Sequence, residues 1–195
     1  MQAKCQVDMT YGDISKQLFM FTIPILLSQI LQQFYNIADT AIIGRYIGTD
    51  ALAAIGSTGL LISVIVNFFI GLSTGISAVI ANQFGANEYD KLKKSISTSL
   101  AVSVLLGIVF TIGSLIFMKP IINILQTPKG VYSLAIDYLK ICFLGITFQL
   151  LYNIGTAILR ALGNTKDPLY FLIFSCILNL ILDILFIVYF GWGVK

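Results

Sequence analysis

The stretch "QLFMFTIPILLSQILQQFYNIA" (residues 17–38) decides the fold, because it has no charged residue and is long enough to cross a bilayer as one helix. Further charge-free stretches follow at 51–87, 95–118, 141–159 and 168–194, the last interrupted only by Asp183. Of all residues 57% are hydrophobic and only 11% are charged, and the mean hydropathy is +0.92. A water-soluble domain needs about a quarter of its residues charged. The sequence therefore predicts an all-α integral membrane protein with five transmembrane helices, at about residues 17–43, 52–82, 94–118, 133–161 and 168–190.

The composition excludes several classes of function. Histidine is absent, which removes most catalytic triads, histidine-liganded zinc sites and histidine proton relays. The net charge of +3 is spread along the chain, so no nucleic-acid partner is expected. No Walker A motif is present, and the three cysteines, Cys5, Cys142 and Cys176, have no metal-binding spacing. We expect a protein without a cofactor whose main surroundings are the lipid bilayer.

The positive charges predict the orientation in the membrane. One side, formed by the N-terminus and two loops, holds seven cations: Lys4, Lys16, Lys91, Lys93, Lys94, Arg160 and Lys166. The other side holds five: Arg45, Lys119, Lys129, Lys140 and Lys195. Because cytoplasmic loops carry the excess of lysine and arginine, we expect a cytoplasmic N-terminal segment (1–16) before the transmembrane lobe (17–195), in the cytoplasmic (inner) membrane.

Polar residues recur on single faces of the predicted helices. Those of the first helix fall within an arc of roughly 120°: they are Thr22, Gln29, Gln32, Gln33, Asn36, Asp39 and Thr40. Ser175, Asn179 and Asp183 share a face of the fifth helix, and Gln149, Asn153 and Thr156 lie on the fourth. Serine and threonine often serve helix–helix contacts, whereas amides and carboxylates on several helices favour a polar cavity. Candidate lining residues are Gln32, Asn36, Thr40, Asn153 and Thr156.

Asp39, Asp137 and Asp183 are the acidic residues inside the predicted helices, and Asp137 lies near the start of the fourth helix, close to Lys140. Asp183 lies about 24 Å past Asp167 at 1.5 Å per residue, and Asp39 about 35 Å past Lys16 before tilt and the bend at Pro24 shorten it. Both side chains therefore fall in the outer half of a core ~30 Å thick. Two carboxylates at similar depth can converge on one site, where they bind a proton or, together with Asn179, a hard cation such as Na⁺.

Two of these residues also have a purely structural interpretation. Asp39 can mark the helix end at the interface and pair with Arg45. Pro24 can be a passive kink, because proline removes one helical hydrogen bond, or a hinge that reshapes the cavity when the carboxylates change state. The sequence alone leaves both alternatives open.

Two features of the sequence resemble enzyme motifs. "GLSTG" (71–75) matches GxSxG formally, but it lacks the strand–turn–helix context and the chain has no histidine. Paired intramembrane aspartates also resemble an aspartyl protease. In this chain, however, the residues before Asp39 and Asp183 are Ala38 and Leu182, and the single Tyr-Asp pair (89–90) lies in a loop. We therefore expect no enzymatic activity, with the protease as the less favoured alternative.

Four segments resemble the MATE (multidrug and toxic compound extrusion) transporters. They are "FYNIADTAIIGRYIGTDALAAIG" (34–56), "VIANQFGANEYDKLKKS" (79–95), "LRALGNTKDP" (159–168) and "NLILDILFI" (179–187), in the family's order and spacing. The resemblance implies one lobe of a twelve-helix antiporter that exchanges organic cations for H⁺ or Na⁺. Resemblance to the DinF-like bacterial branch implies that Asp39, Asp183 and Asn179 form the coupling site. It adds Tyr35 to the cavity.

The chain is shorter than the resemblance requires. It ends at "FGWGVK" (190–195), where a sixth helix of the lobe is expected, and the second lobe does not follow. We therefore expect a fragment whose missing partner is the C-terminal lobe of the same protein. A lipid-linked oligosaccharide flippase of the same superfamily is the alternative, although its cavity is expected to hold cationic residues for pyrophosphate.

Overall fold

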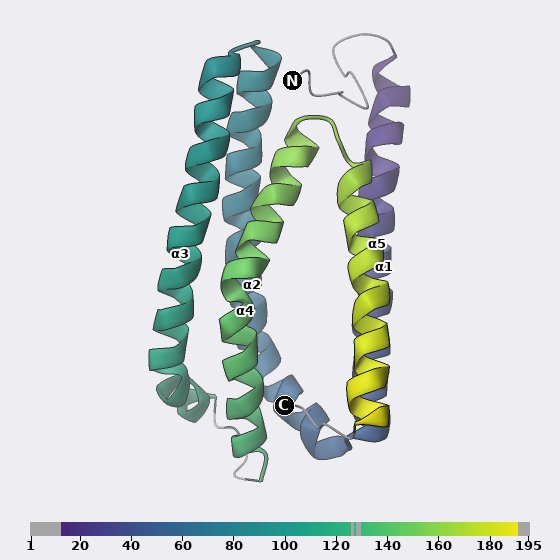
Figure 1. Cartoon of the computed structure of the whole chain (residues 1–195), viewed down its shortest axis with the longest axis vertical. Helices are drawn as coiled ribbons and strands as arrows, with labels where there is room; N and C mark the ends of the chain where they lie inside the picture. Colours follow the sequence, from purple (N-terminus) through teal and green to yellow (C-terminus); the bar gives the residue numbers. More distant parts are fainter. Residues whose placement is uncertain (1–12, 126, 128–129, 191–195) are drawn as a thin grey trace.

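Five long helices account for most of the computed structural model, which describes residues 13–125, 127 and 130–190 (Figure 1). They are α1 (Ile14–Tyr46), α2 (Thr49–Gly85), α3 (Tyr89–Ile124), α4 (Tyr132–Ala161) and α5 (Lys166–Asp183), and α5 continues into a π-helical segment, η1 (Ile184–Tyr189). All five are long and apolar enough to cross a membrane. The predicted all-α membrane fold is confirmed.

Short-range signals set the ends of the helices. The Asp13 side chain caps α1 by accepting a 3.0 Å hydrogen bond from the Ser15 backbone N–H. Gly48 separates α1 from α2 with a φ of 112°, a conformation that residues with a Cβ rarely adopt. Gly163 has a φ of 82° after the end of α4, and Pro168 lies in the first turn of α5, where no N–H is needed. These short connections reverse the direction of the chain between α1 and α2 and between α4 and α5.

The observed helices extend beyond the charge-free stretches at several ends. α1 begins at Ile14 and α3 at Tyr89, because the charged residues of these first turns remain helical at the interface. The fifth helix loses its regular α pattern after Asp183, where η1 begins. Residues 1–12 and 191–195 lie outside the described residues, so the division into a segment 1–16 and a lobe 17–195 stays a prediction.

Helices α2, α3 and α4 form the apolar core. Its largest fully buried side chains include Phe69 of α2 and Phe143, Leu139 and Leu150 of α4. The ring of Phe110 on α3 packs edge-on against Phe69 with a centroid distance of 5.4 Å. These three helices therefore interlock through side chains that exclude both water and lipid.

Gly107 marks the closest approach within this group. A Cβ atom added to Gly107 would lie 2.8 Å from the Cα of Thr147 on α4, so only glycine fits here. One turn further along α3, Thr111 Oγ1 donates a 3.1 Å hydrogen bond to the carbonyl oxygen of Phe143. Small residues and hydroxyls bring the backbones of membrane helices together in this way.

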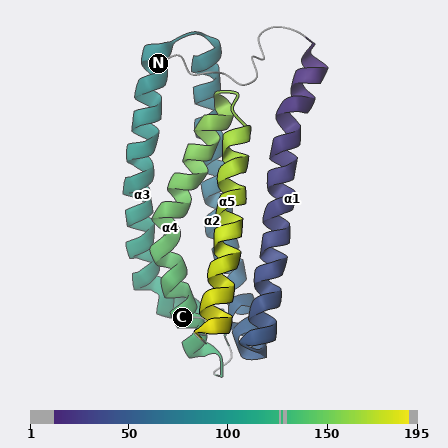
Figure 2. The ribbon, with the colours of Figure 1, turned by 45° about the vertical axis from the view of Figure 1, so that its right-hand side comes forward.

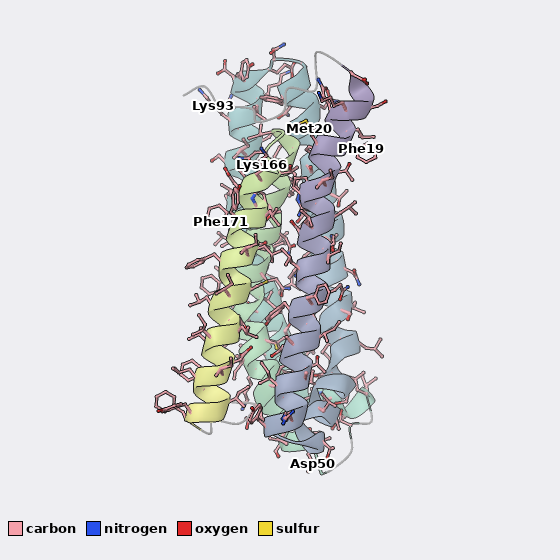
Figure 3. The ribbon with its side chains drawn as sticks, turned by 90° about the vertical axis from the view of Figure 1, so that its right-hand side faces the viewer. Phe19, Met20, Asp50, Lys93, Lys166 and Phe171 are labelled. Atoms are coloured by element: carbon pink, nitrogen blue, oxygen red, sulfur yellow. The ribbon has the colours of Figure 1, made fainter. Side chains whose placement is uncertain are left out.

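Helices α1 and α5 lie beside this core as a second group. α1 packs mainly against α5, and the two run side by side in the same direction (Figures 2 and 3). Large apolar side chains on their outer faces are exposed, such as Phe19 of α1 at 71% and Phe171 of α5 at 61%. Such faces are stable in contact with lipid chains. The space between the two groups holds the polar residues considered next.

Candidate functional site

The predicted aspartates lie on the two neighbouring helices α1 and α5. Asp39 follows Tyr35 by one turn on α1, and Asp183 follows Asn179 by one turn on α5. All four side chains are partly buried. Since α1 and α5 pack against each other, the four residues face one region of the bundle. We refer to Asp39 and Asp183 as the aspartate pair.

Electrostatic interactions connect the residues around the aspartate pair. The carboxylate of Asp183 lies within range of the charge on Asp39, and the hydroxyl of Tyr35 lies within range of both. From α4, Tyr138 also interacts with Asp39. Two negative charges that lie close together repel each other strongly in a medium of low dielectric constant. Binding one proton or one cation removes that repulsion.

Two oxygens of the fifth helix have no partner in the described part of the chain. They are Oδ1 of Asn179 and Oδ2 of Asp183, and both are buried. A buried oxygen without a hydrogen bond is costly, so a proton, a cation or a water molecule is the natural third component. The described residues contain no group of three His, Cys, Asp or Glu side chains that could hold a metal ion. A monovalent cation would therefore depend on the aspartate pair together with neutral oxygens such as that of Asn179.

The alternative of an Asp39–Arg45 ion pair is not observed. The ion pairs among the described residues are Lys91–Glu88 and Lys140–Asp137, both on exposed helix turns. Arg45 lies in the last turn of α1 and is exposed. Asp39 is thus a partly buried carboxylate next to a second carboxylate, and no cation among the described residues forms an ion pair with it.

A polar cavity of about 290 Å³ lies between α1, α2, α4 and α5. Its polar lining residues are Ser28, Gln29, Gln32, Ser73, Thr74, Ser77, Gln149, Tyr152, Asn153, Thr156 and Arg160. Three of the predicted lining residues, Gln32, Asn153 and Thr156, are among them. The cavity lies on the predicted cytoplasmic side of the aspartate pair, since Gln32 precedes Asp39 by seven residues, or about 10 Å of helix.

The other predicted lining residues lie elsewhere on α1. Tyr35 belongs to the surroundings of the aspartate pair, as described above. Asn36 and Thr40 are exposed and do not line this cavity, and Thr40 Oγ1 donates a 2.7 Å hydrogen bond to the backbone oxygen of Asn36. A role for these two in a larger cavity stays a prediction.

Pro24 lies within α1, one turn before Ser28. Its side chain is buried, and the helix continues through it without a break. Ser28 Oγ donates a 2.7 Å hydrogen bond to the Pro24 carbonyl oxygen, a type of bond that often accompanies helix bending. Pro24 thus lies between the cytoplasmic end of α1 and both polar regions, and its role as a hinge stays a prediction.

The sequence reasoning missed two residues of these sites. Tyr138 was not considered, because a tyrosine on an apolar helix carries no distinctive signal. The charge pattern alone assigns Arg160 to a loop, although it follows Asn153 by seven residues and Thr156 by four and so continues their helical face. This helical spacing is the signal in the sequence that places Arg160 on the same face as Asn153 and Thr156.

Comparison with known proteins settles the family. The MatE family model matches residues 24–185. The chain belongs to the MatE family. It is 33% identical over 178 residues to the probable multidrug resistance protein YoeA of Bacillus subtilis, covering 91% of this chain and 38% of that protein. An FAD transporter of Shewanella oneidensis is 29% identical over 181 residues, with 92% and 39% of the two chains covered.

A solved structure of the same family has the same fold. The crystal structure of MATE in complex with MaD3S matches with a TM-score of 0.91 and 28% identity, covering 100% of this chain and 43% of that one. The MatE chain described here therefore spans about two fifths of the length of its relatives, as expected of most of one lobe. It is a multi-pass membrane protein of a transporter family and not an enzyme, so the aspartyl protease alternative is set aside.

Proposed function

We propose that this chain is the N-terminal lobe of a secondary active exporter that exchanges organic cations for H⁺ or Na⁺ across the cytoplasmic membrane, with its N-terminus in the cytoplasm. The observation that carries the proposal is the aspartate pair of α1 and α5, beside the Asn179 Oδ1 atom that no described residue hydrogen-bonds. Membership of a transporter family supports it. A carboxylate pair inside a membrane bundle is costly unless it binds and releases cations.

The exchange follows from competition for one negative charge. With the pair ionised, an organic cation is attracted to the region of Tyr35, Asp39 and Asp183. Binding of H⁺ or Na⁺ neutralises the pair and removes that attraction, so the organic cation dissociates. Because Asp39 lies on α1 and Asp183 on α5, occupancy also alters the force between these helices, and α1 bends near Pro24. The two lobes of the complete protein then expose the site alternately to either side.

The relatives of this chain bear on the nature of the substrate. The relatives include proteins named for multidrug resistance and for FAD transport, so the family admits more than one class of solute. The oligosaccharide flippase also stays open, because Arg160 provides one cation in the polar cavity. Export of a small organic dye distinguishes the two, since a flippase specific for lipid-linked pyrophosphates does not move such dyes.

The test is ethidium efflux from cells that express the complete protein. Asp39→Asn and Asp183→Asn keep the size of the side chains and remove their charge, and we expect each to reduce efflux at least about tenfold, the effect of losing one charge-assisted contact. Asp50→Asn is the matched control, because Asp50 is an exposed carboxylate in the first turn of α2, at the tip of the bundle (Figure 3). Efflux that survives both substitutions in normally expressed protein contradicts the proposal.

A further inference from the structure

A groove of about 570 Å³ lies between α2 and α3, toward the end of the bundle where Lys93 lies (Figure 3). Gly71 and Gly75 line it from α2, and Lys94 and Thr98 line it from α3. None of its described lining residues also lines the polar cavity between α1, α2, α4 and α5. The groove is therefore a second recess of the bundle, separate from the site described above.

Gly71 and Gly75 keep the groove open on the side of α2. They lie one turn apart, both are exposed, and a Cβ atom added to either would meet nothing within 4 Å. Glycine destabilises the interior of a helix relative to alanine, and no close contact among the described residues offsets that cost here. The open space thus fits an occupant from outside the described part of the chain.

The groove extends from the membrane interface into the bilayer. Lys94 lies about 8 Å along α3 from the first residue of that helix, Tyr89. Gly71 lies about 21 Å from the last residue of α2, Gly85. Because α2 and α3 run in opposite directions from one short connection, both distances measure depth from the same end. The groove therefore begins at a cation near the interface and continues about 13 Å toward the bilayer centre.

The two walls of the groove differ in polarity. Lys94 is exposed and belongs to no ion pair among the described residues. The hydroxyls of Ser95, Thr98 and Ser99 line the same wall, and no described acidic residue lines the groove. All lining residues from α2 are glycines or aliphatic residues. A molecule with a negative head group and an apolar chain complements this arrangement.

We propose that this groove is a binding site for an anionic phospholipid, with the phosphate at Lys94 and an acyl chain along Gly75 and Gly71. Basic pockets between transmembrane helices bind the head groups of anionic lipids, and hydroxyl groups provide further hydrogen-bond donors to phosphate oxygens. The lipid supplies its charge and its apolar chain at the depths where the groove complements them. The inference goes beyond the proposed function and does not depend on it.

The experiment compares two lipids that differ in the charge of the head group. The complete protein in detergent micelles is titrated with phosphatidylglycerol or with phosphatidylcholine of the same acyl chains, and native mass spectrometry gives both affinities. We expect phosphatidylglycerol to bind about fivefold more tightly, the contribution of one lysine near an anionic head group. Lys94→Gln removes this preference.

The matched control for the charge is Lys91→Gln. Lys91 precedes Lys94 by three residues on α3 but does not line the groove, and its Nζ lies 2.8 Å from Oε1 of Glu88. We expect this variant to keep the preference for phosphatidylglycerol. An equal effect of the two lysine substitutions, or no preference in the unaltered protein, overturns the inference.

A second pair of variants tests the acyl chain. Gly75→Leu fills the groove without a clash among the described residues, so we expect binding of both lipids to weaken about tenfold, as when two methylene groups lose their contacts. Gly56→Leu is the control, because Gly56 is also an exposed glycine of α2 with open space around it but does not line the groove. Unchanged lipid binding by Gly75→Leu overturns the inference.

Further measurements exclude other occupants of the groove. Displacement of phosphatidylglycerol by inorganic phosphate assigns Lys94 to a free anion and overturns the inference. A lower unfolding temperature of Gly75→Leu than of Gly56→Leu in lipid-free detergent assigns the groove to a protein segment and also overturns it. The protein with both Asp39→Asn and Asp183→Asn should lose ethidium efflux and keep phosphatidylglycerol binding, so the lipid site and the exporter fail or stand separately.

Discussion

The two groups of helices differ in what holds them together. α2, α3 and α4 interlock through buried apolar side chains such as Phe69 and Phe143, whereas α1 and α5 meet beside a carboxylate pair and an open polar cavity. Dense packing gives the first group one stable arrangement. Repulsion between like charges and an open polar cavity leave the second group free to change its arrangement with ion occupancy. The difference separates a rigid support from the part that we propose to move.

The largest expected effect comes from a substitution that disrupts the packing of α3 against α4. Gly107→Leu places a side chain against the backbone of Thr147 and forces α3 away from α4, which also breaks the hydrogen bond from Thr111 to Phe143. We expect a loss of about 1–3 kcal/mol of stability, as overpacked cores show. Thermal unfolding of the purified protein, followed by circular dichroism, measures it.

The matched control is Gly113→Leu on the same helix. A Cβ atom at Gly113 meets nothing within 4 Å, so this substitution adds the same side chain without a clash. We expect its unfolding temperature to equal or exceed that of the unaltered protein. If both variants unfold at the same lowered temperature, the close approach of α3 and α4 does not contribute to stability as described.

A smaller effect is expected from a substitution in α1, the helix that we propose to bend during transport. Pro24→Ala restores an N–H in the middle of α1 and so stiffens the helix. In the complete protein we expect slower ethidium transport with unchanged ethidium affinity and slightly higher thermal stability. Pro120→Ala, inside α3 of the rigid group, should leave the transport rate unaltered. Equal slowing by both substitutions argues against a hinge at Pro24.

The sequence predicted the helices well because lipid imposes a simple rule. Every stretch free of charge and long enough to span the bilayer became a helix, from 17–38 to 168–182. Helix rise and direction alone predicted that Asp39 and Asp183 lie at a similar depth. The π-helical turns after Asp183 did not, because a shift in hydrogen-bond register leaves no mark on composition.

The cavity was harder to predict than the aspartates. A polar arc on α1 shows which face avoids lipid, but the packing of α1 against α2, α4 and α5 decides which polar residues share one space. Gln32 therefore lines the cavity, while Asn36, one turn later on the same arc, does not. Arg160 illustrates the same limit, because its long side chain extends from the end of a helix toward the interior.

The central claim is that one charge at the aspartate pair is shared between the coupling ion and the substrate. The most direct measurement titrates ethidium into weakly buffered complete protein and records H⁺ and Na⁺ release with ion-selective electrodes. We predict about one cation released per ethidium bound, as competition for one site requires, and none from the protein with both Asp39→Asn and Asp183→Asn. Undiminished release from that double variant, or ethidium binding without release from the unaltered protein, would contradict the account.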